Sequence, residues 1–295
     1  MAAMALPTRK PGPDRKATAA PVPDARPRLE LSGPKLSAAF ETLVARAEES
    51  GGVERYVDAL RLKSRLFART LGEGRAPGVS LADLRALCAW MPTVRRRIGA
   101  YVEAESFESL RARIAALLDG AADTATTDAR IEAFCARFPQ DGAHRWVRDL
   151  AAELLHQVDP ERYPAMTRWV WDARANTGVL REIWHGEDVD NLRIQVPDRY
   201  ETYLVLREEL AQFLASHGVY RDVMFFVDLL AARIYAAYIH EQGGTYLRPD
   251  FASVEEPMVH VRRLLGMDGV AENGRTRLKA ADGTAVVIDD PSRPE

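Results

Sequence analysis

From residue 34 onward, apolar residues recur at intervals of three and four along most of the chain, which is the period of an amphipathic helix. The pair Gly51-Gly52 ends the first such segment, and Ser80, with Asp83 three positions later, is typical of a helix N-cap. In this part of the chain, the pattern predicts helices over residues 34–50, 53–71, 81–91, 93–103 and 107–118, and a loop over 72–78.

A stretch rich in Ala, Gly and Thr at 119–127 interrupts the pattern and predicts a boundary between two helical units. Beyond it, the pattern predicts helices over residues 127–138, 143–157, 198–217, 222–241 and 254–266. Near the C-terminus, polar–apolar alternation over 276–280, the dipeptide Asp282-Gly283 and the apolar run 285–288 predict a β-hairpin. A lone hairpin is marginally stable, so we expect it to dock on the helices or on a partner.

These elements predict an all-α fold: a multi-helix orthogonal or bundle-like domain with a short C-terminal β-hairpin and a disordered N-terminal tail. The expected organisation places the basic Pro/Ala-rich tail at 1–33 and an N-terminal helical subdomain at 34–120. A C-terminal helical core with a tryptophan-rich segment follows at 125–268, and the hairpin and tail occupy 269–295. Residues 1–33 are predicted to be disordered because they offer too little apolar surface to offset the entropy of ordering.

Composition is that of a soluble globular protein, with 47% hydrophobic and 28% charged residues. The longest apolar run, Val223 to Ile239, contains Asp228 and Arg233, and the N-terminus has no continuous apolar stretch, so we expect neither a membrane span nor a secretory signal. Only two cysteines are present, which favours a reducing cytoplasm. Alanine is abundant and arginine greatly outnumbers lysine, which is typical of a GC-rich bacterial genome.

Four of the five tryptophans lie in one window at 144–185, which also holds several hydrogen-bonding side chains. The candidate binding residues are Trp146, Tyr163, Arg168, Trp169, Trp171, Arg174, Asn176, Trp184 and His185. One interpretation is a ring-lined pocket in which Arg174, Asn176 and His185 are the polar contacts. The other is a core cluster in which these side chains form hydrogen bonds with backbone groups at the ends of helices.

The predicted helix 222–241 is apolar on all sides, which indicates a buried helix or one packed in an interface. Asp228 lies in its middle, and an ionised carboxylate there needs a partner. Arg207 on the preceding helix is a candidate partner. A buried acid of this kind is either a functional group or one half of a structural ion pair.

Two Glu-x-x-His units, Glu153 with His156 and Glu182 with His185, resemble the ligand spacing of carboxylate-bridged metal sites in helical bundles. Asp228 and one of Glu208 or Glu209 could supply the remaining ligands of an iron or manganese pair. The alternative is that both units make ordinary surface or capping contacts, in which case the protein has no cofactor.

Residues 80–101 have the outline of a helix-turn-helix, since a capped helix, a break at Met91-Pro92 and a second helix beginning Thr93-Val94-Arg95-Arg96-Arg97 follow one another. The detailed pattern fits poorly, because Arg97 falls where an apolar residue should be buried. Nucleic acid is therefore the weaker candidate partner, and the alternative is a solvated, Arg-rich helix face.

The chain contains no Walker loop, no Gly-x-Ser-x-Gly and no dinucleotide-binding glycine motif, which lowers the expectation of an enzyme. We expect a cytoplasmic, non-enzymatic accessory or adaptor protein that binds another protein or associates with itself. The first alternative is an enzyme or small-ligand-binding protein with an aromatic pocket at 144–185. The second is a DNA-associated regulator that uses residues 80–101.

Overall fold

The computed structural model describes residues 26–104, 106–186, 191–246, 258–269, 275–279 and 285–287. Within these ranges the chain is all-α with one short hairpin, as the hydrophobic period predicts. The α-helices are α1 (Gly33–Glu48), α2 (Glu54–Leu71), α3 (Leu81–Ala89), α4 (Ile98–Ala104), α5 (Phe107–Leu118), α6 (Thr127–Cys135), α7 (Trp146–Val158), α8 (Val179–Glu182), α9 (Tyr200–Ser216), α10 (Val223–Tyr246) and α11 (Val259–Leu264). Single turns of 3-10 helix are η1 (Ala76–Gly78), η2 (Thr124–Thr126) and η3 (Gly142–His144), and the strands are β1 (Arg275–Lys279) and β2 (Ala285–Val287).

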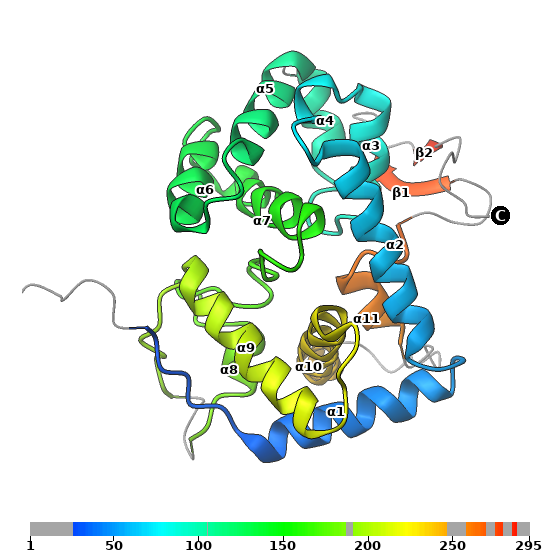
Figure 1. The fold of residues 1–295 in the computed structure, drawn as a ribbon, viewed down its shortest axis with the longest axis vertical. Coiled ribbons are helices and arrows are strands. Elements are labelled where there is room, and N and C mark those ends of the chain that lie inside the picture. Colours follow the sequence, from blue (N-terminus) through cyan, green and yellow to red (C-terminus); the bar gives the residue numbers. More distant parts are fainter. Residues whose placement is uncertain are drawn as a thin grey trace, which may run out of the picture.

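The helices form two groups that α2 and α7 join (Figure 1). Helices α3 to α6 lie in one group, and α1, α8, α9 and α10 lie in the other. The long helix α2 runs along both groups and packs against α3, α7 and α10. Helix α7 therefore sits in the middle of the molecule, where side chains from both groups meet.

Local sequence explains where several helices begin and end. The Ser80 hydroxyl accepts a hydrogen bond from the backbone N–H of Asp83 at 3.1 Å, so the predicted N-cap of α3 is confirmed. Helix α2 ends at Gly72, where a Cβ atom would lie 2.5 Å from the carbonyl oxygen of Ala68. Only a residue without a side chain fits this close approach.

The segment before α4 corrects one predicted helix. Residues 92–97 form turns rather than the start of a helix, and α4 begins only at Ile98. The backbone N–H groups of Val94 and Arg95 both bond to the carbonyl oxygen of Met91, and the buried Arg95 side chain pairs with Asp268 at 2.8 Å. This tertiary contact fixes a compact turn where local sequence alone favoured a helix.

Order also begins earlier than predicted. The predicted tail 1–33 includes residues 26–32, which run along the molecule ahead of α1, whereas residues 1–25 lie outside the described residues. The Ser32 N–H donates to the Ile183 carbonyl at 2.8 Å, and the His185 N–H donates to the Glu30 carbonyl at 2.7 Å. These backbone bonds, which a low apolar content does not reveal, hold the segment against α8.

The predicted hairpin is confirmed over its described residues. Strands β1 and β2 pair in antiparallel fashion, with Arg275 opposite Val287 and Lys279 opposite Ala285. Strand β1 packs against α3 and α4, and its Leu278 side chain is fully buried. The hairpin therefore docks on the helices through β1, which gives it the packing surface that a lone hairpin needs.

The buried side chains on both sides of 119–127 belong to one hydrophobic cluster, so the proposed subdomain boundary remains a prediction. Helix α10 crosses this cluster and packs against α1, α2, α8, α9 and α11. Its segment Val223–Glu241 has a mean hydropathy of 1.4, and 44% of it is buried. It is long and apolar enough to cross a membrane, a property that it shares with the core helices of soluble proteins.

Candidate functional site

The tryptophan window is mostly core. Trp146, Trp171 and Trp184 are buried, while Trp169 is half-buried. The Trp171 indole N–H donates to the carbonyl oxygen of Val196 at 3.0 Å, which satisfies its single polar group. Tyr163 is also buried, and its hydroxyl donates to the carbonyl oxygen of Ala121 at 2.5 Å. These rings hold neighbouring segments together.

The polar candidates of the window have different surroundings. Asn176 binds backbone on the neighbouring segment, donating to Leu192 O at 2.9 Å and accepting from Ile194 N at 3.1 Å. Arg168 pairs with the buried carboxylate of Asp149 at 2.6 Å. Arg174 and His185 are exposed. The geometry thus supports the core interpretation for this part of the window.

A different set of predicted residues does come together around a small cavity. Glu153 and His156 from α7, Asp228 from α10 and Trp169 line it, and Lys63 from α2 completes its charged wall. The cavity has a volume of ≈ 10 Å³, which is room for about one water molecule. Sequence analysis missed Lys63, because a lone lysine within an amphipathic helix has no local signal of burial.

The four ionisable groups form two pairs. Lys63 Nζ lies 3.3 Å from Glu153 Oε2 and donates to the Leu265 carbonyl at 3.0 Å, at the end of α11. His156 Nε2 lies 2.9 Å from Asp228 Oδ2. The partner of Asp228 is therefore His156, whereas Arg207, the predicted candidate, donates to the backbone carbonyls of Pro160 and Glu161.

The predicted iron or manganese pair has no ligand set among the described residues. Both ring nitrogens of His156 are engaged, with Asp228 and with the Tyr163 carbonyl, so neither is left to bind a metal. The second Glu-x-x-His unit ends in the exposed His185, and no group of three or more His, Cys, Asp or Glu side chains suited to a metal occurs in the described ranges.

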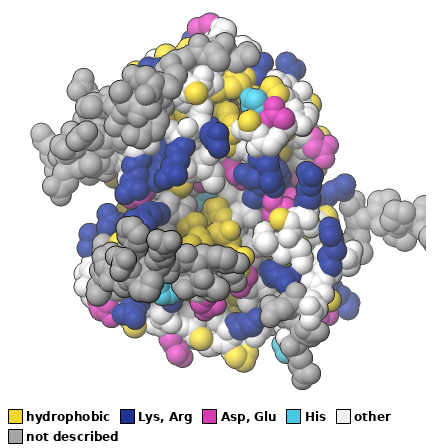
Figure 2. All heavy atoms as spheres, turned by 180° about the vertical axis from the view of Figure 1, so that it is seen from behind, with side chains coloured by type: hydrophobic (Ala, Val, Ile, Leu, Met, Phe, Trp, Pro, Cys, Tyr) yellow, Lys and Arg dark blue, Asp and Glu magenta, His cyan; other side chains and the backbone are white. Residues whose placement is uncertain are grey.

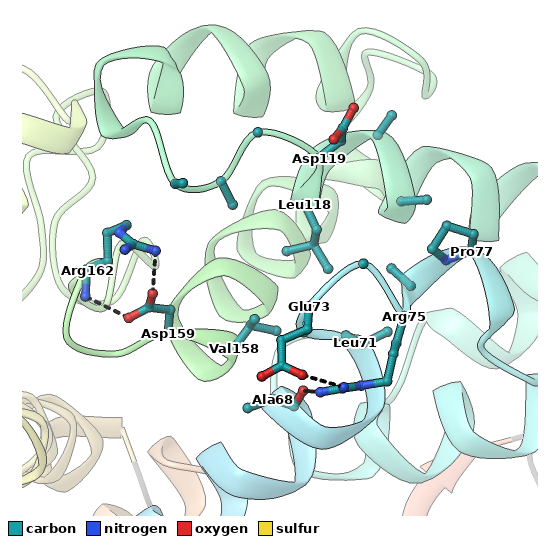
Figure 3. A pocket seen from close by; sticks show the side chains of 18 of the residues that line it. Ala68, Leu71, Glu73, Arg75, Pro77, Leu118, Asp119, Val158, Asp159 and Arg162 are labelled. Carbon is teal, nitrogen blue, oxygen red and sulfur yellow. Dashed lines mark hydrogen bonds and ion pairs between the residues drawn. The ribbon is translucent and has the colours of Figure 1, made fainter.

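A separate cleft, which the sequence did not reveal, is much larger than the cavity beside Lys63. It has a volume of ≈ 990 Å³ and lies where the C-terminal ends of α2, α5 and α7 meet (Figure 3). Figure 3 shows Leu71, Leu118 and Val158 near its centre. Most of the other lining residues are small: Ala68, Gly72, Gly74, Ala76, Pro77, Ala115, Ala116, Gly120, Ala121 and Ala122. The predicted loop at 72–78 and the first residues of the predicted boundary stretch at 119–127 thus provide two of its walls.

The rim of the cleft carries charges, most of which are paired. The Arg75 guanidinium lies 2.7 Å from Glu73 and also donates to the Ala68 carbonyl at the end of α2. Arg162 lies 2.7 Å from Asp159. Among the described residues, the lining includes no His, Cys, Ser, Thr, Lys or Tyr. The cleft therefore offers apolar and small surfaces with charged edges, and no nucleophile or usual proton-transfer group besides carboxylates.

The remaining predicted surface is the basic segment after α3. Arg95 is buried in its pair with Asp268, and Arg96 and Arg97 are exposed on the turn. A recognition helix presents its first turns to a groove of DNA, and residues 93–97 are not helical. The helix-turn-helix outline is therefore wrong in its second helix.

On the face opposite that of Figure 1, hydrophobic side chains gather in a central hollow bordered by Lys and Arg (Figure 2). Two neighbouring tyrosine rings of α10 are half-buried: the Tyr235 ring centre lies 6.0 Å from that of Trp169 and 5.6 Å from that of Tyr238. The described residues therefore bury the aromatic side chains of α10 only in part.

Comparison with known proteins gives no match to a family model, to a curated protein or to a solved structure.

Proposed function

We propose that this chain is a cytoplasmic, non-enzymatic accessory protein that binds a segment of another protein in the cleft between α2, α5 and α7. The observation that carries the proposal is the combination of an open volume of ≈ 990 Å³ with a lining of small and apolar residues. Small residues allow the backbone of a bound segment to approach closely, and large partner side chains can fill the space they leave. Arginine and carboxylates at the rim suit polar contacts around an apolar centre.

The alternatives have less support. An enzyme or small-ligand-binding protein built on the 144–185 window would use the cavity among Lys63, Glu153, His156 and Asp228. That cavity has room for about one water molecule, and its charged groups are already paired with one another. A DNA-associated regulator would need the recognition helix that residues 93–97 do not form.

The test is capture of partners from the native host with cleft variants. Ala116 is exposed on α5 and lines the cleft, so Ala116→Trp should fill part of the opening without disturbing the core. Ala112, one turn earlier on the same helix, is exposed and is not a lining residue, so Ala112→Trp is the matched control.

We expect the wild type and the Ala112→Trp variant to retain the same partner, and the Ala116→Trp variant to bind it at least about tenfold more weakly, which corresponds to about 1.4 kcal/mol. Circular dichroism should show equal helix content in all three proteins. Equal retention by both variants, or no retained protein at low salt, would contradict the proposal.

A further inference from the structure

The pair of His156 and Asp228 forms a wall shared by two small cavities. One is the cavity beside Lys63 and Glu153, and the other lies on the side of α9, with a volume of ≈ 20 Å³. His156 and Asp228 line both cavities and join α7 to α10. Neither residue is used by the proposed partner cleft, so this site is independent of the proposed function.

The hydrogen bonds of His156 fix the positions of its protons. Its Nδ1 atom lies 2.8 Å from the carbonyl oxygen of Tyr163, and a carbonyl can only accept, so Nδ1 carries a hydrogen. Its Nε2 atom lies 2.9 Å from Asp228 Oδ2. A hydrogen bond at this second contact requires one more proton, bound to Nε2 or to Oδ2.

We propose that His156 and Asp228 form a proton-binding site that holds one proton between Nε2 and Oδ2, and that loss of this proton loosens the contact between α7 and α10. With the proton in place, the pair is neutral overall and the two side chains attract. Without it, the lone pair of Nε2 faces an ionised carboxylate inside the core. Repulsion and the cost of the buried charge then favour separation of the two helices or entry of water.

The groups around the pair offer no replacement for the lost proton. Among the residues that line the two cavities, α2 contributes Lys63, α7 contributes Glu153, and α9 contributes Tyr203 and Arg207. Lys63 is paired with Glu153, and Arg207 binds backbone carbonyls. From α11, only Leu264 and Leu265 face the first cavity.

The electrostatics give the direction of the effect. Burial lowers the pKa of His156, but the Asp228 carboxylate, the hydrogen bonds and the charge of Glu153 outweigh it and raise the pKa above its ordinary value. The folded protein therefore binds the proton more tightly than the unfolded chain does. The stabilisation is complete below the unfolded-state pKa of histidine, about 6.5, and is lost as the pH rises through the higher pKa that His156 has in the folded state.

The decisive comparison is the wild type with Asp228→Asn, which has nearly the same shape. The amide that replaces the carboxylate can donate to Nε2 of a neutral His156, so this pair persists without the extra proton. Above about pH 6.5, the unfolding equilibrium constant of the wild type should rise relative to that of the variant, by up to about tenfold per pH unit for one proton. Parallel pH profiles from urea unfolding would overturn the proposal.

A second measurement needs no variant. Amide hydrogen exchange of Leu229 to Ala232 in α10, corrected for the intrinsic effect of pH, should show lower protection at pH 9 than at pH 6.5 in the wild-type chain. The amides of Ile114 and Leu117 in α5, which are buried residues remote in sequence from the pair, should have the same protection at both pH values. Unchanged protection of α10 across this range would overturn the proposal even if Asp228→Asn did not fold.

Discussion

At the scale of single residues, burial decides which polar and aromatic groups are structural. Trp171 is fully buried, its N–H donates to the Val196 carbonyl, and its own carbonyl accepts from the Tyr203 hydroxyl at 2.7 Å. Burial of so large a ring contributes much of the local stability.

Replacing Trp171 should therefore destabilise the fold strongly. We expect Trp171→Ala to cost about 3–5 kcal/mol in the free energy of unfolding, because it removes a buried ring and leaves a cavity. The half-buried Trp169 gives the comparison, and Trp169→Ala should cost clearly less. Urea unfolding followed by circular dichroism measures both, and equal losses would contradict the assignment of Trp171 to the core.

The two cysteines should differ in reactivity. Burial raises the pKa of the Cys88 thiol to about 12, and Cys135, which is half-buried, has a pKa raised by the same cause. Thiolate is the reactive form, so a thiol reagent at pH 8 should leave Cys88 unmodified in the folded protein and modify it rapidly in urea. Mass spectrometry identifies the modified residue, and rapid native labelling of Cys88 would show that the α3 region opens readily.

The buried pair of Lys63 and Glu153 should be costly to break and much less costly to remove. Lys63→Met leaves an unpaired buried carboxylate and should destabilise the fold by about 3–5 kcal/mol. The double variant Lys63→Met with Glu153→Leu should recover most of this loss, since it leaves no uncompensated charge. If denaturant unfolding gave the same stability for the single and double variants, the loss in Lys63→Met would not come from the unpaired Glu153 carboxylate.

At the scale of elements, the hydrophobic period identified the helices whose pattern repeats over several turns. Helices α2, α5 and α9 match their predicted spans closely, and α10 begins as predicted but continues to Tyr246, because local sequence alone determines an amphipathic or fully apolar face. The turn at 92–97 could not be predicted, because it depends on the contact between Arg95 and Asp268, 173 positions apart in the chain. Ordered residues 26–32 likewise depend on distant backbone partners.

The close approach of the segment after α11 to the end of α3 depends on one glycine. Gly266 has a φ of +74°, and a Cβ atom there would lie 1.9 Å from the carbonyl oxygen of Trp90. Gly266→Ala should therefore destabilise the protein by about 3 kcal/mol or more, through strain and a backbone clash. Gly78→Ala is the control, since nothing lies within 4 Å of its added Cβ. Thermal unfolding should separate the two variants, and equal midpoints would show that the segment around Gly266 shifts freely.

At the scale of the whole molecule, the candidate site illustrates what sequence alone leaves out. The loop at 72–78 and the break in the helical pattern at 119–127 were expected, but their proximity follows only from the packing of α2 against α7 and of α5 beside η1. The charged cavity was partly foreseen, since Glu153, His156 and Asp228 were candidates, while their pairing and Lys63 emerged from the fold. Long-range packing, which no local pattern encodes, determines both sites.

The most direct measurement of the central claim is photocrosslinking from inside the cleft. A photoreactive phenylalanine analogue placed at Ala116 of the full chain should crosslink a host protein on irradiation in cells, and the same analogue at Ala112 should not. The account predicts one recurrent adduct from position 116, which mass spectrometry should map to a single segment of one host protein. Identical crosslinking from both positions, or none from position 116, would contradict it.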